Sequence, residues 1–172
     1  MLIHRFLPNL ANPHCRNLFN LASTKRKVVK TIQLRTPLEQ TVSVVADVAN
    51  YSKFLPFCTT SVVAGAGNPT FSADLTFEWG SFKETIRHNV VVDATSVVSV
   101  AEASRIAKMV KYNWRFYPTT DNGTEVKVDL DVEFQNILHA AVFDLNVDQI
   151  STEMINRFRD RINTAHLLEK KN

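Results

Sequence analysis

Two ionisable side chains, Glu84 and His88, stand four residues apart in a segment that we expect to be a strand. A carboxyl and an imidazole can act as general acid and base, and a neutral imidazole can also donate a hydrogen bond to a ligand. Residues four apart on a strand share a face. This is the one acid–base pair on offer, because no Ser-His-Asp, Cys-His or His-x-x-x-His arrangement supports catalysis or a metal site.

The face that Glu84 and His88 occupy depends on the turn that precedes their strand. If Gly80-Ser81 is a two-residue hairpin turn, Glu84 opposes Phe77 and His88 opposes Ala73 on the concave face of the sheet. A buried carboxyl and imidazole would then need hydrogen-bond partners. A bulge or a three-residue turn would instead place both side chains in water.

A second group of candidates lies in an apolar segment that fits neither a helical face nor strand alternation. Its Pro56 removes a backbone donor and disfavours helix at Leu55. Such a segment either fills the core between a helix and the sheet or forms a pocket lid that contacts a ligand. The candidates are Tyr51, Phe54, Leu55, Pro56 and Phe57.

The elements that must position these residues are mostly strands. Strands are predicted over residues 25–35, 59–64, 70–79, 82–92, 97–103, 109–117 and 124–135. Thr36 as the N-cap and Pro37 at the first position predict a short helix that ends near Asn50, and the segment 51–57 forms a second short helical piece. A long amphipathic helix is predicted from Asn136 to about Leu168.

The long helix is the only element large enough to cover the apolar face of this sheet. Trp114 and Phe116 are assigned to that face, where core packing is the favoured role and a cavity wall the alternative. Alternating Asp129, Asp131 and Glu133 on the other face predict a solvated edge. The fold class is therefore α+β, a helix-grip: a curved antiparallel sheet of about six or seven strands around a long C-terminal helix. The space between them suits an apolar ligand.

Charge separates the N-terminus from the body. Residues 1–25 contain no acid, two arginines and near-helically spaced apolar residues, which is the composition of a mitochondrial transit peptide; a disordered tail is the alternative. The folded domain is expected over residues 26–170. Seven of the 20 basic residues precede Glu39, which leaves thirteen against 17 acids in the remainder. This balance argues against nucleic acid as a partner.

Several motifs resemble those of one family. The pattern Asp47-Val-x-x-Tyr51-x-x-Phe54-Leu-Pro56-Phe-Cys58 resembles the coenzyme Q-binding proteins of mitochondria and their bacterial relatives, in the START-like, polyketide-cyclase-like superfamily. Further stretches that agree in order are Trp79-Gly-Ser-Phe-Lys-Glu84, Asn113-Trp-Arg-Phe116, Val128-x-Leu-x-Val-Glu-Phe134-x-Asn136 and Met154-x-x-x-Phe158-x-x-Arg161. The resemblance covers residues 28–165. One departure is Ala103-Ser-Arg-Ile-Ala-Lys108, where the family usually has a Gly-Pro-Phe-Lys-like turn.

The resemblance implies a non-enzymatic protein that binds ubiquinone or its prenylated precursors without a metal. It implies a peripheral location on the matrix side of the inner mitochondrial membrane, and a chaperone or carrier role in respiration and ubiquinone biosynthesis, with respiratory or quinone-biosynthesis complexes as further partners. The segment 51–57 and His88, as a donor to the quinone head group, are expected to contact the ligand. Further expected contacts are Phe77, Trp114, Phe116, Phe143 and Met154.

Two alternatives from other classes remain open. One is a cyclase-like enzyme that acts on a polyketide-like substrate with Glu84 and His88 as its acid and base. The other is a protein-interaction module, as in bacterial relatives that associate with ribosomes.

Overall fold

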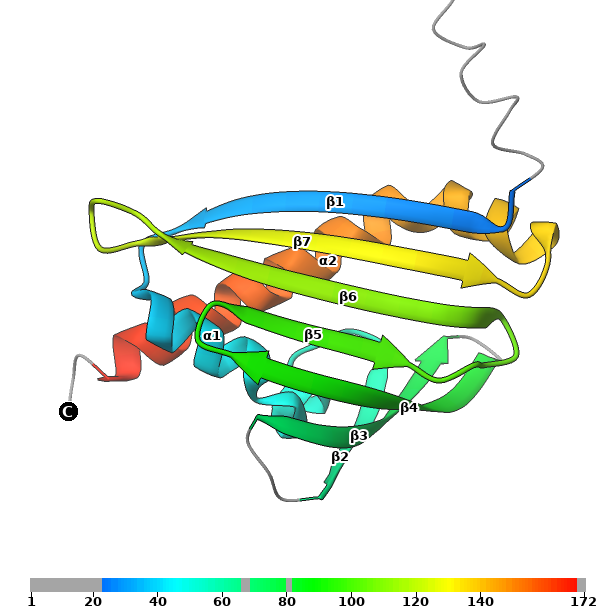
Figure 1. Cartoon of the computed structure of the whole chain (residues 1–172), viewed down its shortest axis with the longest axis horizontal. Helices are drawn as coiled ribbons and strands as arrows, with labels where there is room; N and C mark the ends of the chain where they lie inside the picture. The colour runs from blue at the N-terminus through cyan, green and yellow to red at the C-terminus, as the bar shows by residue number, and fades with distance from the viewer. Residues whose placement is uncertain (1–22, 66–68, 80–81, 170–172) are drawn as a thin grey trace, which may run out of the picture.

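The computed structural model describes residues 23–65, 69–79 and 82–169. Its centre is an antiparallel sheet of seven strands in the order β1-β7-β6-β5-β4-β3-β2 (Figure 1). The strands are β1 (Lys25–Leu34), β2 (Cys58–Ala64), β3 (Thr70–Trp79), β4 (Phe82–Asp93), β5 (Ser96–Ala101), β6 (Ala107–Pro118) and β7 (Thr124–Phe134). The predicted fold class is confirmed, and each predicted strand is present with ends that shift by three residues or fewer.

The register of β3 against β4 follows the prediction. Trp79 pairs with Phe82, Phe77 with Glu84 and Ala73 with His88. Residues 80 and 81 themselves, like the predicted transit peptide up to residue 22, lie outside the described residues. The register therefore puts Glu84 and His88 on the face of β4 that carries Val90 and the other inward residues.

Two short helical elements follow β1. Helix α1 (Leu38–Ala46) is succeeded by a 3-10 helix, η2 (Val48–Lys53), which begins the aromatic segment. The prediction of Thr36 as the N-cap is wrong: Pro37 holds that position, and no side-chain hydrogen bond caps the helix. Thr36 is instead buried, and its carbonyl oxygen accepts a hydrogen bond of 2.8 Å from the Thr124 hydroxyl.

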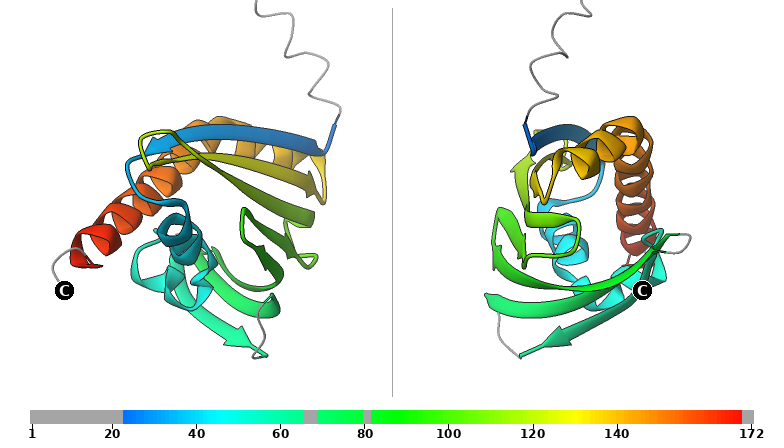
Figure 2. Two further views of the ribbon diagram at one scale, coloured as in Figure 1. Left: turned by 60° about the vertical axis from the view of Figure 1, so that its left-hand side comes forward. Right: turned by 90° about the vertical axis from the view of Figure 1, so that its right-hand side faces the viewer.

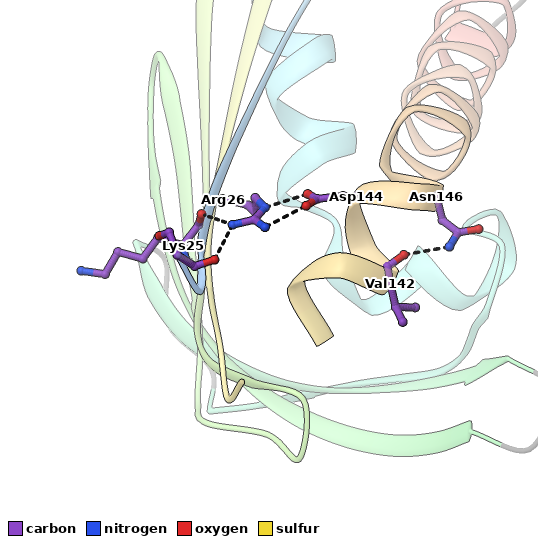
Figure 3. A network of polar contacts seen from close by, with 6 residues as sticks. Lys25, Arg26, Val142, Asp144 and Asn146 are labelled. Carbon is purple, nitrogen blue, oxygen red and sulfur yellow. Dashed lines mark hydrogen bonds and ion pairs between the residues drawn. The ribbon is translucent and has the colours of Figure 1, made fainter. Parts of the chain in front are cut away.

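The long helix α2 (Ile137–Glu169) lies across the concave side of the sheet (Figure 2). It begins where predicted, because the Asn136 side chain accepts a hydrogen bond of 3.0 Å from the His139 backbone N–H. Its first turns run at an angle to the remainder (Figures 2 and 3). The Asn146 side chain donates to the Val142 carbonyl at 2.8 Å near this bend, and such insertions into the helical ladder are a common cause of bending.

Ion pairs hold the bent part of α2 beside β1. The Arg26 guanidinium makes two hydrogen bonds of 2.7 Å to the Asp144 carboxylate, and also donates to the carbonyl oxygens of Ser23 and Lys25 (Figure 3). Lys30 lies 3.5 Å from Asp148, one helical turn further along. Arg26 and Lys30 of β1 thus belong to the fold and match acids on α2.

The outer face of β7 corrects one prediction. Because β7 lies between β1 and β6, its acidic row does not form a sheet edge. Asp129 is buried, with Arg115 as an ion-pair partner and the Lys27 ammonium 4.0 Å away. Among the described residues, no helix is both long enough and apolar enough to span a membrane.

Candidate functional site

A largely apolar cavity of about 320 Å³ lies between the concave face of the sheet, the η2 segment and α2. Strands β1 and β3 to β7 all contribute to its wall, as do the turns of α2 between Phe143 and Phe158. The wall contains no Asp, Glu, Asn or Gln side chain among the described residues. Its polar members are Lys30, Tyr51, His88, Ser99, Tyr112 and Ser151. This composition suits a ligand that is mostly hydrocarbon.

Packed aromatic rings form part of the cavity wall. The ring of Phe158 on α2 has its centroid 4.7 Å from that of Trp114 on β6, and 5.3 Å from those of both Tyr51 and Phe54. The last two rings also meet edge to face at 5.7 Å. Such geometry adds to the energy of burial, so the cluster fixes α2 and η2 against the sheet.

Burial disfavours charge in and beside the cavity. It raises the pKa of the Tyr112 phenol, and it is the main reason that the pKa of the Tyr51 phenol is raised, with smaller effects from Asp47, Tyr112 and Cys58. Burial also raises the pKa of the Cys58 thiol to about 11. Cys58 is thus a small buried residue, as predicted, rather than a thiolate nucleophile.

Among the described residues, His88 supplies the one imidazole in the wall, and it is only 5% exposed. Its Nδ1 lies 3.0 Å from the hydroxyl of Ser99 on β5, whereas its Nε2 is buried without a hydrogen-bond partner. Burial lowers the pKa of this imidazole from 6.5 to about 4, so the ring is neutral near pH 7. An unmet nitrogen on the wall of an apolar cavity is able to hydrogen-bond a molecule that enters the cavity.

Glu84 shares the concave face with His88 but has a different environment. Its Oε1 accepts a hydrogen bond of 2.8 Å from the Arg105 backbone N–H, and the Arg105 guanidinium lies 3.7 Å from the same oxygen. That guanidinium also stacks over the Phe82 ring, 5.4 Å from its centroid. Glu84 does not line the cavity. Four strand residues span about 13 Å at about 3.3 Å each, so the carboxyl and the imidazole do not form a pair.

The structure brings most of the predicted contact residues to one cavity. Nine of the eleven line it: Tyr51, Leu55, Pro56, Phe57, Phe77, His88, Trp114, Phe143 and Met154. The other two, Phe54 and Phe116, do not line it. Phe54 packs behind the wall in the aromatic cluster, and Phe116 is fully buried in the core.

Sequence reasoning missed several wall residues. Ile106 lies in the loop that departs from the family pattern, and it lines the cavity even so. Ser99 stands between Val97 and Ala101 in the inward row of β5. A single polar residue in an apolar row of period two was the signal that could have revealed it. Among the described residues, no three His, Cys, Asp or Glu side chains gather to hold a metal ion.

The sheet, the long helix across its concave side and the cavity between them define the helix-grip, START-like class of proteins. The chain belongs to the family described as polyketide cyclase / dehydrase and lipid transport, which matches residues 34–159. In this class the cavity is the site to which a function must be assigned.

Three known proteins illustrate the range of the likeness. The chain is 29% identical to the Schizosaccharomyces pombe protein named "Coenzyme Q-binding protein coq10, mitochondrial", over 76% of this chain and 82% of that one. It is 24% identical to the Escherichia coli K12 "Ribosome association toxin RatA", over 78% and 85%. The Zhui aromatase/cyclase from Streptomyces sp. R1128 has a similar fold, with a TM-score of 0.73 and 15% identity over 81% and 94%.

Proposed function

We propose that this protein binds ubiquinone or a prenylated precursor in the cavity and carries it as a lipid chaperone. One observation carries the proposal: a largely apolar cavity whose wall, among the described residues, holds a single buried imidazole with an unmet nitrogen. The similarity to the S. pombe coenzyme Q-binding protein supports the same ligand. The ligand would serve respiratory electron transport, and its precursors ubiquinone biosynthesis.

The cavity matches the two parts of a prenylated quinone. Each methylene that leaves water for an apolar wall contributes about 0.8 kcal/mol, so a prenyl tail gains most from residues such as Phe77, Phe143 and Met154. A quinone head group carries oxygens that only accept hydrogen bonds. The Nε2 of His88, when protonated, supplies a donor that none of the described groups satisfies.

Exposed apolar side chains support contact with a membrane. On the first turns of α2, Leu138, Val142 and Leu145 follow a spacing of four and three residues, and Leu145 is 85% exposed. Phe143 and Val147, on the other side of the same turns, line the cavity. An exposed apolar stripe of this kind suits the interface of a bilayer. We place the protein peripherally on the matrix side of the inner mitochondrial membrane, in keeping with the predicted transit peptide.

The enzyme alternative finds less support in the geometry. A cyclase-like reaction would need a convergent acid and base, and Glu84 and His88 are its candidates. Arg105 engages one oxygen of the Glu84 carboxylate, Oε1, and Glu84 lies outside the cavity wall. The wall therefore offers a binding site without a paired acid and base among its described residues, and we propose binding without catalysis.

The first experiment identifies the ligand. The full chain is purified from a host that makes ubiquinone, its lipids are extracted with organic solvent, and they are identified by mass spectrometry. Co-purified ubiquinone or a prenylated precursor supports the proposal. An empty cavity, or a polyketide-like molecule in it, would instead support one of the two alternatives, the cyclase-like enzyme or the protein-interaction module.

The second experiment tests His88 as the polar anchor of the head group with His88→Leu, which keeps the volume but removes the donor. One hydrogen bond is worth about 0.5–1.5 kcal/mol, so affinity for a short-chain ubiquinone should fall about 2- to 13-fold. Affinity for a prenyl hydrocarbon of equal length should not fall. The matched control is His166→Leu, because His166 contacts Gln40 on α1 and does not line the cavity. Unchanged quinone affinity in His88→Leu would refute the anchor.

A further inference from the structure

Ser99 is a wall residue whose side chain reaches the buried imidazole of His88. It lies on β5, directly opposite Val90 of β4, so that His88 is its diagonal neighbour on the adjacent strand. Diagonal neighbours are within reach of polar side chains, and the Ser99 Oγ lies 3.0 Å from His88 Nδ1. The hydroxyl and the imidazole therefore form one hydrogen-bonded unit beside the cavity.

The hydrogen-bonding capacity of the two groups assigns the proton on the ring. A neutral imidazole has one N–H donor and one acceptor nitrogen, and a hydroxyl has a single proton to donate. If Ser99 donates to Nδ1, the hydroxyl proton is satisfied, and only the Nε2–H proton lacks a partner. If Nδ1–H donates to Ser99, both the hydroxyl proton and the Nε2 lone pair lack partners. The first arrangement leaves fewer groups unsatisfied.

We infer that Ser99 is a positioning residue that holds His88 in its Nε2–H form, so that the cavity prefers the oxidised quinone over the reduced quinol. This inference rests on the proposed function. It goes further, because it assigns a role to a residue outside the predicted site and a redox preference to the cargo.

The preference follows from what each head group brings to the anchor. A quinone carbonyl accepts a hydrogen bond from Nε2–H, and the quinone head group has no donor of its own that needs an acceptor. A quinol oxygen can also accept from Nε2–H, but each quinol hydroxyl brings a proton that needs an acceptor, and His88 in its Nε2–H form supplies none. Among the described residues, the wall offers no carboxylate or side-chain amide as an acceptor, and Lys30 only donates. The hydroxyls of the wall, such as those of Tyr112 and Ser151, can donate to a quinone or accept from a quinol and so favour neither form. The Nε2–H of His88 is the group that distinguishes the two.

The size of the preference can be bounded. A buried donor left without a partner costs about 1–3 kcal/mol, which corresponds to a ratio of dissociation constants of about 5- to 150-fold. The lowered pKa of His88 supports the same picture, because a ring that stays neutral near pH 7 has its tautomer as the only variable. A cationic ring would carry protons on both nitrogens, so Ser99 could not then favour one tautomer over the other.

The test compares oxidised and reduced short-chain ubiquinone, the latter under anaerobic conditions, as ligands of the full chain. Quenching of tryptophan fluorescence reports binding, since Trp114 lies in the wall. The wild type should bind the oxidised form about 5- to 150-fold more tightly. In Ser99→Ala the ring can shift its proton to Nδ1 and accept from the quinol, so the ratio should fall at least threefold.

Two variants serve as comparisons. Ser99→Thr restores a hydroxyl and should restore the preference for the quinone. Ser72→Ala removes a serine hydroxyl that bonds Asn89 at 2.9 Å outside the cavity wall, and it should leave the ratio unchanged. A ratio that falls equally in Ser99→Ala and Ser99→Thr would show that packing, rather than the hydroxyl, sets the preference, and would overturn the inference.

A second readout does not depend on ligand binding. The nitrogen-15 chemical shifts of the His88 ring in the ligand-free protein distinguish Nε2–H from Nδ1–H. The wild type and Ser99→Thr should show Nε2–H, and Ser99→Ala a mixture of both. Nδ1–H in the wild type, or equal affinity for the two redox forms, would overturn this inference alone. Failure of both forms to bind would overturn the proposed function and this inference with it.

Discussion

The buried imidazole of His88 should make the protein lose stability as the pH falls from 6.5 to 4. Its pKa is about 4 in the folded protein against 6.5 for an ordinary histidine, and burial is the cause. The unfolded chain therefore binds a proton in this window that the folded chain does not bind. Since the free energy of unfolding rises with pH wherever the unfolded state holds more protons, the contribution of His88 is complete above pH 6.5 and is lost toward pH 4.

The magnitude follows from the two pKa values. The difference between 6.5 and about 4, at about 1.4 kcal/mol for each pH unit, amounts to about 3 kcal/mol. No discount for solvent is needed, because the residue is only 5% exposed. A loss of this size is a large part of the stability of an ordinary domain.

Urea denaturation of the wild type and of His88→Leu at pH 7.5, 6.5, 5.5 and 4.5 measures the effect. Carboxylates whose pKa is lowered by a neighbour, such as Asp74 beside Arg87, also lose stabilising energy in acid, but they do so equally in both proteins. The gap between the two stability curves should change by about 2–3 kcal/mol between pH 7.5 and 4.5. Parallel curves, or a His88 titration by nuclear magnetic resonance near pH 6.5, would refute the reasoning.

Two further predictions concern the frame of the cavity. Phe158→Ala should lower the free energy of unfolding by about 3–5 kcal/mol in urea, because the ring is 3% exposed and touches three other aromatic rings; Leu168→Ala, at an exposed position of the same helix, should change it by less than about 0.5 kcal/mol. A loss below about 1 kcal/mol in Phe158→Ala would contradict the role of the cluster. Gly123→Ala should lower the melting temperature, because a Cβ there would clash with the backbone carbonyl of Leu34; the cost of about 1–3 kcal/mol corresponds to roughly 2–12 °C, and an unchanged midpoint would contradict it.

Much of the fold was predictable because its strands alternate and its turns are marked. In the sequence of β7, the apolar inward row, which includes Val126, Val128 and Val132, alternates with a charged outward row, so the inward face was predictable without knowing the neighbouring strands. The outward row was wrongly predicted to be a solvated edge, because the neighbouring strands were unknown. Alternation does not say which strand lies at an edge, and the pairing of β7 with β1 became evident only from the complete sheet order.

The helix start at Thr36 shows a limit of local signals. A threonine before a proline with a glutamate three residues after the threonine is a common capping pattern. Here tertiary contacts determine the outcome, because Thr36 is buried and its carbonyl oxygen bonds Thr124 on β7. The Asn136 cap, which faces no such competition, was predicted correctly.

The candidate site shows why a shared strand face is a weaker guide than a shared helix face. Residues four apart on a helix are neighbours, whereas on a strand they are separated by about 13 Å. Glu84 and His88 therefore lie on the predicted face without meeting, and each finds its partner on another part of the chain: Glu84 finds Arg105 in the loop after β5, and His88 finds Ser99 on β5. A polar pair in a sheet must be sought among diagonal neighbours of adjacent strands, which requires the register as well as the sequence. That is why the wall could be predicted largely from apolar rows, while its hydrogen-bonded pair of His88 and Ser99 could not.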